Sequence, residues 1–357
     1  MDVSVLVPVL NEERHIRETV AAMRAQQFDG ELEFLFADGG SDDRTRAILE
    51  ELSSNDPRLR VLDNPRRQTP SGLNVCLRAA RGEYVARMDG HTFYPPNYLA
   101  DGVRRLERGD VAWVAGPPLL RPVGKVSRAV SSALSTRLGQ GPTQRFAGGV
   151  TEAELDTGVF AGVWRRETVL ALGGWDERWS RNQDSEMAAR FLDAGERIVC
   201  LPRMGAEYVP RDTLPLLARQ FFNYGYYRAA TAHRHPTSMR RSHLLLPAFV
   251  LTLGLSAVGP RRLRSLAHFG VATYALAVIT QTAVTLRESE QRADDALLPA
   301  VFVAMHSSWG LGFIWGGLKH PPLAALVRLI GARGLAARVG RRAASQPVYA
   351  PSLDETP

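Results

Sequence analysis

One tight turn in the chain, Asp89-Gly90-His91, offers two groups that bind metal ions, a carboxylate and an imidazole. The glycine between them gives the backbone room to approach a ligand closely. A carboxylate suits Mg²⁺, and an imidazole nitrogen shifts the preference toward Mn²⁺. By itself the tripeptide is more typical of a turn aspartate beside a surface histidine, so its interpretation depends on the elements that position it.

Strands and helices alternate around this turn. Short apolar runs predict buried strands over residues 3–7, 32–37, 60–62 and 83–88. Helical patterns between them predict helices over 11–25 and 72–81, and Ser41 is the expected N-cap of a third. This alternation indicates βαβ units and a mostly parallel sheet, in which ligands bind beyond the carboxyl ends of the strands. Three segments fall at that edge: Pro8 to Asn11, Asp38 and the Asp89 turn.

The middle of the chain has a weaker pattern. Residues 121–149 are rich in glycine, serine, arginine and proline, which predicts a loop over the site. Residues 182–194 have a helical pattern that Gly195 ends, and residues 213–232 predict an aromatic, amphipathic helix.

Three later stretches carry no formal charge: residues 242–260, 265–286 and 296–318. A helix needs about 20 apolar residues to span a bilayer, so the second and third qualify. The first is marginal because it contains Pro247 and Gly254. Buried core helices are the alternative. We predict a membrane-associated helical region over residues 233–320, followed by a basic cytoplasmic tail over 321–357 whose end is disordered.

Charge is distributed unevenly along the chain. Residues 1–241 hold 33 Lys+Arg and 31 Asp+Glu, whereas residues 242–357 hold 11 and 6. The excess beside the apolar stretches favours contact with an anionic membrane face. The nearly balanced first part lacks the basic surface of a nucleic-acid-binding protein. Cys76 and Cys200 are the only cysteines, which excludes a disulfide-rich scaffold, and the first residues do not form a signal peptide, so we expect the catalytic region to face the cytoplasm.

Three motifs together resemble the family 2 glycosyltransferases: Val7-Pro-Val-Leu-Asn-Glu-Glu13, Asp38-Gly-Gly-Ser-Asp-Asp-Arg-Thr45 and Gly82-Glu-Tyr-Val-Ala-Arg-Met-Asp89. The resemblance covers about residues 1–240. Residues 64–74, the Asp-Gly-His turn and the apolar tail resemble more closely the branch of succinoglycan-type exopolysaccharide glucosyltransferases. The resemblance to the family implies a GT-A catalytic domain over residues 1–232, with a Rossmann-like, mostly parallel sheet that binds a nucleotide-diphosphate sugar.

The resemblance assigns donor-binding roles to nine residues: Pro8, Val9, Asn11, Glu12, Asp38, Arg67, Asn74, Asp89 and Arg228. Asp38 would accept a hydrogen bond from the base, which suits the N3–H of uracil. Asp89 and His91 would hold the divalent cation, Mn²⁺ or Mg²⁺, that neutralises the leaving diphosphate. Alternatives stay open at three positions. Arg66 could replace Arg67, Asn74 could cap or pack its helix, and the aromatic helix around Arg228 could be core or a membrane-interface anchor.

The acceptor hydroxyl needs a general base. Asn182-Gln-Asp-Ser-Glu186 resembles the acidic pair of the family, with Gln183 in place of the first acid. The base would then be Asp184. Glu186 is the rival, but it lies four residues before Arg190, a spacing that favours an ion pair. Asp156 could belong to the acceptor side or form a turn.

The implied function is metal-dependent, inverting transfer of one sugar, from a UDP-hexose by preference, to a lipid-linked or glycan acceptor such as a polyprenyl diphosphate. It would serve exopolysaccharide or cell-surface glycan synthesis at the cytoplasmic face of a bacterial inner membrane. The alternative is a membrane-attached nucleotide-sugar-binding protein without turnover, which Gln183 and His91 suggest. A nicotinamide dehydrogenase is excluded because residues 8–13 lack the Gly-x-Gly-x-x-Gly motif.

The charges between the apolar stretches favour one topology. If all three stretches span, Arg261 to Arg264 lie outside and the acidic loop 287–295 lies inside, against the positive-inside rule. If residues 242–260 only dip into the cytoplasmic leaflet, the arginines and the basic tail lie inside and the acidic loop lies outside. We therefore predict two spans, 265–286 and 296–318.

Overall fold

The computed structural model describes residues 1–90, 92–140, 151–158, 161–288 and 292–329. Its described residues pack as two compact units, the first from residues 1–119 and 151–208, the second from residues 120–140 and 209–329. The aromatic helix, Leu214–Arg234, packs with the second unit. The predicted boundary of the catalytic domain at residue 232 stays a prediction. The predicted tail, residues 321–357, is described only as far as Leu329.

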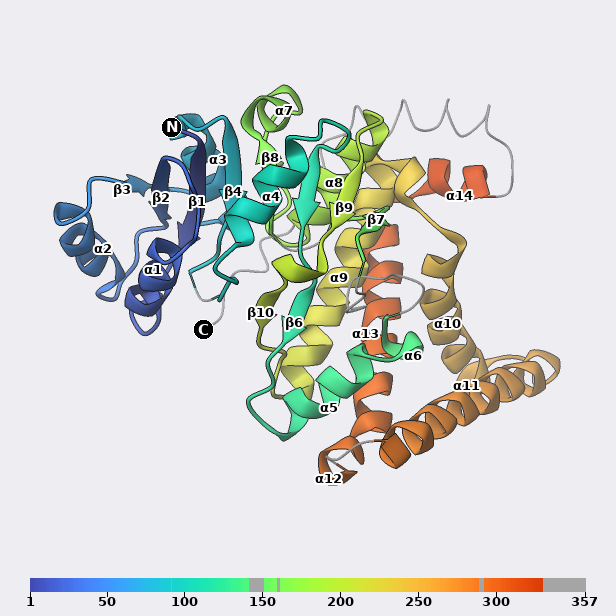
Figure 1. Ribbon diagram of the computed structural model, residues 1–357. Helices are drawn as coiled ribbons and strands as arrows, with labels where there is room; N and C mark the ends of the chain where they lie inside the picture. The colour runs from blue at the N-terminus through green and yellow to red at the C-terminus, as the bar shows by residue number, and fades with distance from the viewer. Residues whose placement is uncertain (91, 141–150, 159–160, 289–291, 330–357) are drawn as a thin grey trace. The chain divides into compact units, whose positions relative to one another are not determined.

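Within the described residues, the first unit contains an eight-stranded sheet in the order β3-β2-β1-β4-β8-β5-β9-β7 (Figure 1). The strands are β1 (Val3–Val9), β2 (Leu32–Asp38), β3 (Leu59–Asp63), β4 (Tyr84–Arg87), β5 (Trp113–Ala115), β7 (Ala153–Leu155), β8 (Gly162–Arg165) and β9 (Ile198–Cys200). Strands β3, β2, β1 and β4 run parallel, as do β5 and β9. Strands β8 and β7 are antiparallel to their neighbours. The predicted mostly parallel sheet is confirmed.

Strand β1 extends to Val9, two residues beyond the predicted end, so it passes through Pro8. Pairing with β4 stops at Leu6 and Arg87, while pairing with β2 continues to Val9 and Asp38. Beyond Leu6 the strand is therefore an edge on its β4 side, where a missing N–H is tolerated. The register places the ends of β1 and β2 next to each other at the carboxyl edge of the sheet.

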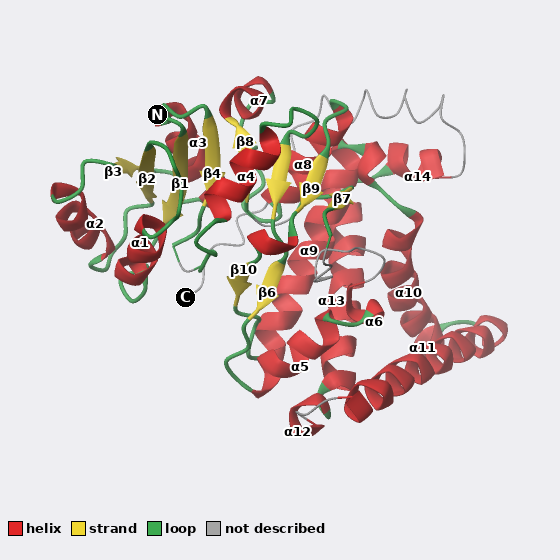
Figure 2. Cartoon of the chain, viewed as in Figure 1, coloured by secondary structure: helices red, strands yellow, loops and turns green. Residues whose placement is uncertain are grey.

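Helices cover both faces of the sheet, which gives three layers (Figure 2). Helices α1 (Ile16–Arg24), α2 (Thr45–Ser54) and α4 (Tyr98–Leu106) pack on one face. Helices α3 (Thr69–Ala79), α7 (Arg166–Ala171) and α8 (Gln183–Asp193) pack on the other. A short ribbon of β6 (Pro118–Leu120) and β10 (Ala206–Tyr208) and a 3₁₀ turn, η1 (Pro202–Met204), complete this part.

The described part of the second unit is helical. Its elements are α5 (Lys125–Leu134), α6 (Arg137–Gln140), α9 (Leu214–Arg234), η2 (Pro236–Ser238), η3 (Arg241–Leu244), α10 (Leu245–Val258), α11 (Arg261–Glu288), α12 (Arg292–Asp295), α13 (Leu298–Lys319) and α14 (Leu323–Leu329). Three helices are long and apolar enough to cross a membrane: Arg241–Val258, α11 and α13. They match the three predicted stretches within a few residues.

The predicted loop over residues 121–149 is wrong for its first part, which forms α5 and α6. Ala129, Val130 and Ala133 recur at helical spacing and pack in one cluster with Val301 and Phe302 of α13. The small, polar composition hid this apolar stripe. Residues 141–150 lie outside the described part of the chain.

Candidate active site

Two loops at the carboxyl edge of the sheet are hydrogen-bonded to each other, the one after β1 and the one after β2. Asn11 N donates to Ser41 Oγ at 3.0 Å, and Asp42 N donates to Asn11 Oδ1 at 2.9 Å. Glu12 N donates to Thr45 Oγ1 at 2.7 Å. Asn11 has a left-handed backbone with φ of 56°, which asparagine tolerates well, so α1 begins only at Ile16. These bonds place Asn11 and Glu12 beside the end of β2.

Asp38 ends β2 and its side chain is buried at this edge. Its Oδ1 accepts from Ser41 Oγ at 2.6 Å and from Ser41 N at 3.2 Å, and Arg46 Nη1 lies 3.7 Å from Oδ2. Ser41 is thus a bridge between the two loops and not the predicted helix N-cap, because α2 begins at Thr45. The carboxylate is held in a fixed orientation at the predicted base-binding position.

Arg66 and Arg67, which the sequence left as alternatives, point to different partners. Arg67 Nη2 donates to Asp42 Oδ2 at 3.1 Å, and its Cα would lie 3.3 Å from a Cβ placed on Gly39. Arg66 Nη1 instead donates to Glu177 Oε2 at 2.7 Å. Arg67 is therefore the arginine that lies against the Asp38 loop. Its predicted contact with the donor stays a prediction.

Asn74 uses its amide within the protein. Its Nδ2 donates to Trp175 O at 2.8 Å and to Glu177 Oε1 at 3.0 Å, and its Oδ1 accepts from Trp175 N at 2.8 Å. These bonds pin the segment after α7 to α3. The structure therefore favours the packing role that the sequence left open for Asn74 over a contact with the nucleotide sugar.

The turn after β4 lies against the loop after β1. A Cβ on Gly90 would come within 3.2 Å of Val9 Cγ1 and 3.3 Å of Glu12 Cγ, and Thr19 Oγ1 donates to Gly90 O at 2.7 Å. The close approach explains why a glycine stands here. The turn thus brings Asp89 to the same edge as Val9 and Glu12. His91, the second predicted metal ligand, lies outside the described residues.

A buried arginine of β4, Arg87, bonds both Asp89, the predicted metal ligand, and Asp184, the predicted base. Its Nε and Nη2 donate to Asp89 Oδ1 and Oδ2 at 2.8 and 2.9 Å, and its Nη1 donates to Asp184 Oδ1 at 2.7 Å. One guanidinium therefore holds together carboxylates from the turn after β4 and from α8, which are far apart in the sequence. Arg87 had no role predicted from the sequence. The signal was present, since an arginine at a buried strand position requires carboxylate partners.

The charge of Arg87 is maintained by these partners. Burial alone would lower the pKa of Arg87, but the carboxylates of Asp184 and Asp89 raise it well above its ordinary value. Tyr94 accepts from Asp89 N at 3.0 Å through its hydroxyl oxygen. Burial, together with the Asp89 charge, raises the pKa of Tyr94 well above its usual range, so Tyr94 stays protonated. Asp89 is thus fixed through its side chain and its backbone.

Asp184 and Glu186 have different surroundings at the start of α8. Asn182 precedes the helix with a φ of 58°, and the Asp184 side chain keeps 17% of its surface exposed. Glu186 is buried and paired with Arg190, with Arg190 Nη2 at 2.8 Å from Glu186 Oε2. The expected ion pair of Glu186 is therefore present, although it is buried. Asp184 is the acid that both reaches solvent and shares Arg87 with Asp89.

Two other candidate residues, Asp156 and Arg228, lie on other segments of the chain. Asp156 is exposed, and Gly158 packs so tightly against α8 that a Cβ would lie 2.2 Å from Asp184 O. Arg228 belongs to α9 in the second unit, where its Nη2 donates to Ser238 Oγ at 2.5 Å. The predicted contact of Arg228 with the diphosphate stays a prediction.

The residues present fit a divalent cation that takes most of its ligands from the substrate. Among the described residues, no group of three His, Cys, Asp or Glu side chains is placed to hold a metal ion. Asp89 supplies one carboxylate, 12% exposed, whose oxygens retain lone pairs beside the arginine fork. Mg²⁺ sites are commonly built from one or two carboxylates together with substrate phosphates. Asp89 is suited to that role.

Known proteins resemble parts of this chain, and one curated relative matches most of it. The family described as Glycosyl transferase family 2 matches residues 4–165. The succinoglycan biosynthesis protein ExoA of Rhizobium meliloti (strain 1021) is 30% identical over 315 residues, 87% of this chain and 93% of that protein. An uncharacterized glycosyltransferase of Haemophilus influenzae is 31% identical over 135 residues, 38% of this chain and 42% of its own length.

A solved structure shares the fold. The mannosyltransferase PcManGT from Pyrobaculum calidifontis, in complex with GDP-Man and Mn²⁺, superposes with a TM-score of 0.56 at 19% identity, covering 88% of this chain and 87% of its own. This confirms the predicted GT-A fold. The chain belongs to glycosyltransferase family 2 and is an enzyme that transfers sugars. The alternative of a binding protein without turnover is set aside.

Proposed function

We propose that this glycosyltransferase moves one sugar from a nucleotide-diphosphate sugar to a lipid-linked glycan during exopolysaccharide or cell-surface glycan synthesis. The relative that matches 87% of the chain is named for succinoglycan biosynthesis, and the solved relative was bound to GDP-Man and Mn²⁺. The long apolar helices favour a place at the bacterial inner membrane, with the catalytic unit in the cytoplasm, where nucleotide sugars are made.

The observation that carries the proposal is the shared guanidinium of Arg87. It brings Asp89, on the donor side, and Asp184, on the acceptor side, to the carboxyl edge of the sheet. Transfer with inversion requires the base to lie across the anomeric carbon from the leaving diphosphate. Asp89 and Asp184 both bond to the Arg87 guanidinium, a spacing that suits one acid near the leaving diphosphate and the other as the base. The ion pairs fix the orientation of both carboxylates before substrate arrives.

The nucleotide would lie over the two joined loops after β1 and β2. Pro8, Val9, Asn11 and Glu12 would form one wall. The Asp38 carboxylate, which is buried and bonded to Ser41, would have to become accessible to accept the N3–H of uracil. Arg67, beside the Asp38 loop and exposed, can reach a phosphate or the base. A UDP-hexose is therefore the preferred donor.

The acceptor hydroxyl would lose its proton to Asp184 as its oxygen attacks the anomeric carbon. Arg87 orients that carboxylate toward the acceptor and balances its charge. A divalent cation, Mn²⁺ or Mg²⁺, would be held by Asp89, with His91 as a further ligand, and would neutralise the departing diphosphate. The helix of Gln220 to Arg228 lacks the Gln-x-x-Arg-Trp of processive synthases, which supports transfer of a single sugar.

The test is a donor screen with the detergent-purified full-length protein and a polyprenyl-diphosphate-linked glycan. UDP-, GDP- and dTDP-sugars are compared for nucleotide release and for product. We expect transfer from a UDP-sugar that needs a divalent ion, with Mn²⁺ at least as effective as Mg²⁺. Full activity in excess EDTA would refute the metal role, and activity with GDP- or dTDP-sugars alone would refute the uracil assignment.

A further inference from the structure

The connection between α7 and α8 leads into the proposed base. It comprises residues 172–182, and Asp184 lies in the first turn of the helix that follows. Trp175 of this connection is buried and packs against Trp164 of β8, with the ring centroids 5.7 Å apart. Trp179 is buried as well. The position of Asp184 therefore depends on how this connection is held.

Glu177 is a polar anchor of the connection. Its Oε2 accepts from Arg66 Nη1 at 2.7 Å, and its Oε1 accepts from Asn74 Nδ2 at 3.0 Å. Each carboxylate oxygen thus has a donor of its own. Asn74 lies on α3, and Arg66 lies in the turn between β3 and α3. Glu177 therefore ties the connection before α8 to the turn after β3.

The turn after β3 is itself held rigidly. Asn64 is buried, and its N–H donates to Asp38 O at 2.8 Å. Its Nδ2 donates to Gln68 O at 3.0 Å, and its Oδ1 accepts from Ser71 Oγ at 2.8 Å. Arg67 has a left-handed backbone with φ of 55°, which a residue other than glycine keeps only where its surroundings fix it. The turn therefore moves as one body.

Two neighbouring arginines of this turn bond to different segments. Arg67 Nη2 donates to Asp42 Oδ2 at 3.1 Å, in the loop after β2, whereas Arg66 bonds to Glu177. Because the two arginines are adjacent on a rigid turn, a displacement of one displaces the other. The turn thus links the loop proposed to hold the nucleotide with the connection that precedes α8.

We propose that Glu177 is a positioning residue for sugar transfer. It holds the connection before α8 in place through Arg66, so that Asp184 faces the acceptor. This role rests on the proposed function, in which Arg67 meets the donor and Asp184 is the base. Asp184 then has two supports, since Arg87 holds its side chain and Glu177 holds the backbone that leads to it.

The ion pair should matter more for rate than for stability. The Arg66 side chain is 70% exposed and that of Glu177 is 25% exposed. Exposed ion pairs contribute little to folding stability because water screens them. A small displacement of a catalytic group, in contrast, has a large effect on rate. Melting temperature and kcat, measured on the same variants, therefore separate the two effects.

The test begins with two substitutions of Glu177 in the detergent-purified full-length protein. Glu177→Gln keeps an acceptor for Asn74 and loses the charge that pairs with Arg66, while Glu177→Ala loses both. We expect kcat for transfer to fall on the order of tenfold in Glu177→Gln and further in Glu177→Ala. Binding of UDP with Mn²⁺, measured by calorimetry, should be nearly unchanged. An unchanged kcat overturns the proposal, and so does weakened UDP binding, which would make Glu177 part of the nucleotide site.

A double-mutant cycle tests whether Arg66 is the partner through which Glu177 acts. Arg66→Met should lower kcat about as much as Glu177→Gln. The double variant should be no slower than the slower single variant, because the second substitution removes an interaction already lost. Additive losses would show that the two residues act separately, which contradicts the proposal.

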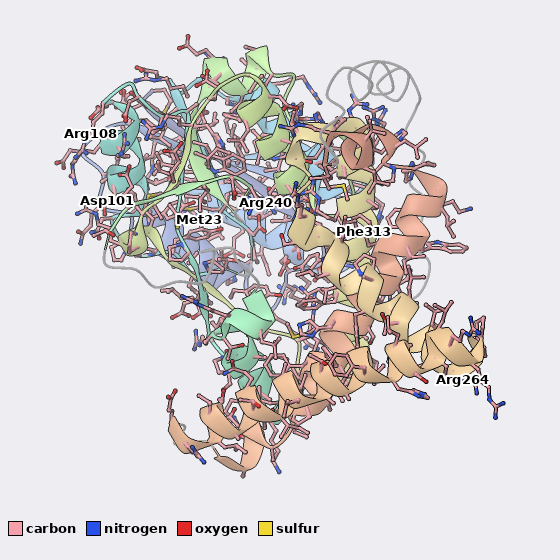
Figure 3. The ribbon with its side chains drawn as sticks, turned by 90° about the vertical axis from the view of Figure 1, so that its right-hand side faces the viewer. Met23, Asp101, Arg108, Arg240, Arg264 and Phe313 are labelled. Carbon is pink, nitrogen blue, oxygen red and sulfur yellow. The ribbon has the colours of Figure 1, made fainter. Side chains whose placement is uncertain are left out.

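A second ion pair of the same unit provides the matched control. Arg104 Nη1 donates to Asp101 Oδ1 at 3.0 Å, and the Arg104 side chain is 64% exposed. Figure 3 shows Asp101 on α4, a helix with no residue of the proposed site. Asp101→Asn and Arg104→Met should leave kcat nearly unchanged, whatever they do to the melting temperature. A loss of kcat equal to that of Glu177→Gln would mean that the effect is only structural, and the proposal would fail.

Hydrogen exchange of the backbone gives a readout that does not require turnover. Exchange over residues 175–182 should be faster in Glu177→Ala than in the unmodified protein and unchanged in Asp101→Asn, because only the first variant frees the connection. Equal exchange in all three proteins would show that Glu177 does not hold it.

Asp184→Asn in the same series separates this inference from the proposed function. If Asp184→Asn is inactive while the Glu177 variants behave like the controls, only the role of Glu177 is wrong. If Asp184→Asn transfers sugar normally, the proposed base is wrong, and Glu177 then has no base to position.

Discussion

At the scale of single residues, the site depends on Arg87 and the two carboxylates that it bridges. A guanidinium binds two carboxylates at once because its donors form a rigid fork. An ammonium is a point charge and cannot replace all three hydrogen bonds. The chain contains a second buried arginine of the same kind, Arg105, which binds Asp110 and Glu152 in the same unit. The two arginines form a matched pair for experiment.

Replacement of Arg87 by lysine should separate positioning from charge. Arg87→Lys keeps the positive charge but releases at least one carboxylate, so we expect kcat for transfer to fall about a hundredfold, the usual cost of a misplaced catalytic group. Arg105→Lys should lower the melting temperature about as much as Arg87→Lys does, but it should leave kcat nearly unchanged. Equal losses of kcat in both variants would show that Arg87 has only a structural role.

Replacement of Asp184 by asparagine tests the general base. Asp184→Asn should reduce transfer by about a hundredfold or more while donor binding, measured by calorimetry, persists. Glu186→Gln breaks the buried pair with Arg190 and should instead reduce thermal stability. If Glu186→Gln proves to be the inactive, stably folded variant, the base has been assigned to the wrong acid.

The two cysteines should be inert in the folded protein. Burial raises the pKa of Cys76 to about 12 and that of Cys200 to about 11. Because the thiolate is the reactive form, maleimide at neutral pH should label neither residue until the protein is unfolded in denaturant. Stoichiometric labelling of the native enzyme, followed by mass spectrometry, would contradict this and would show that the sheet opens readily.

Residue types near strand ends were the most predictable part of the site. Asp38, Asp89 and Asp184 could be named as candidates because each stands in a motif that couples local structure to chemistry, and their roles stay predictions. Arg87 received no predicted role and Asn74 kept two alternatives, because their contacts are with partners about 100 positions away, at Asp184 and Trp175. Sequence spacing carries no record of such contacts.

At the scale of elements, local periodicity predicted what tertiary packing did not override. The four strands around the first motifs and the helix before Gly195 lie where their patterns place them. Helix α5 was missed because its apolar stripe consists mostly of alanine and valine among serines. The pairing of α9 with α13 was also beyond prediction, because an apolar stretch of 22 residues has the same composition beside a protein helix as in lipid.

The close packing of helix α9 against helix α13 can be tested by substituting two glycines of the second unit. Gly312→Ala would place a methyl group against Phe222 O, so we expect a loss of about 1–3 kcal/mol, the usual cost of overpacking. Gly254 in α10 has no atom within 4 Å of an added Cβ, so Gly254→Ala should be neutral or slightly stabilising. Thermal unfolding in detergent compares them. Identical melting temperatures would mean that the helices do not touch.

At the scale of the whole molecule, the sequence predicted the class of protein better than its topology. The three motifs indicated a glycosyltransferase by resemblance, and the apolar stretches indicated helices long and apolar enough to cross a membrane. Counting stretches could not give the number of crossings, since composition does not show which of these helices meet lipid.

Apolar helices that held the enzyme at the bilayer would change how it finds its acceptor. A lipid-linked glycan and a membrane-bound enzyme meet by diffusing in two dimensions, so the rate should follow the mole fraction of acceptor in the bilayer and not its concentration in the suspension. In vesicles with a fixed amount of enzyme and acceptor, added inert phospholipid should therefore slow transfer in proportion to the dilution of the surface. A rate unaffected by added lipid would indicate that the acceptor is captured from solution. For a cell, output would then be set by how crowded the membrane is with acceptor, while the water-soluble donor has unrestricted access.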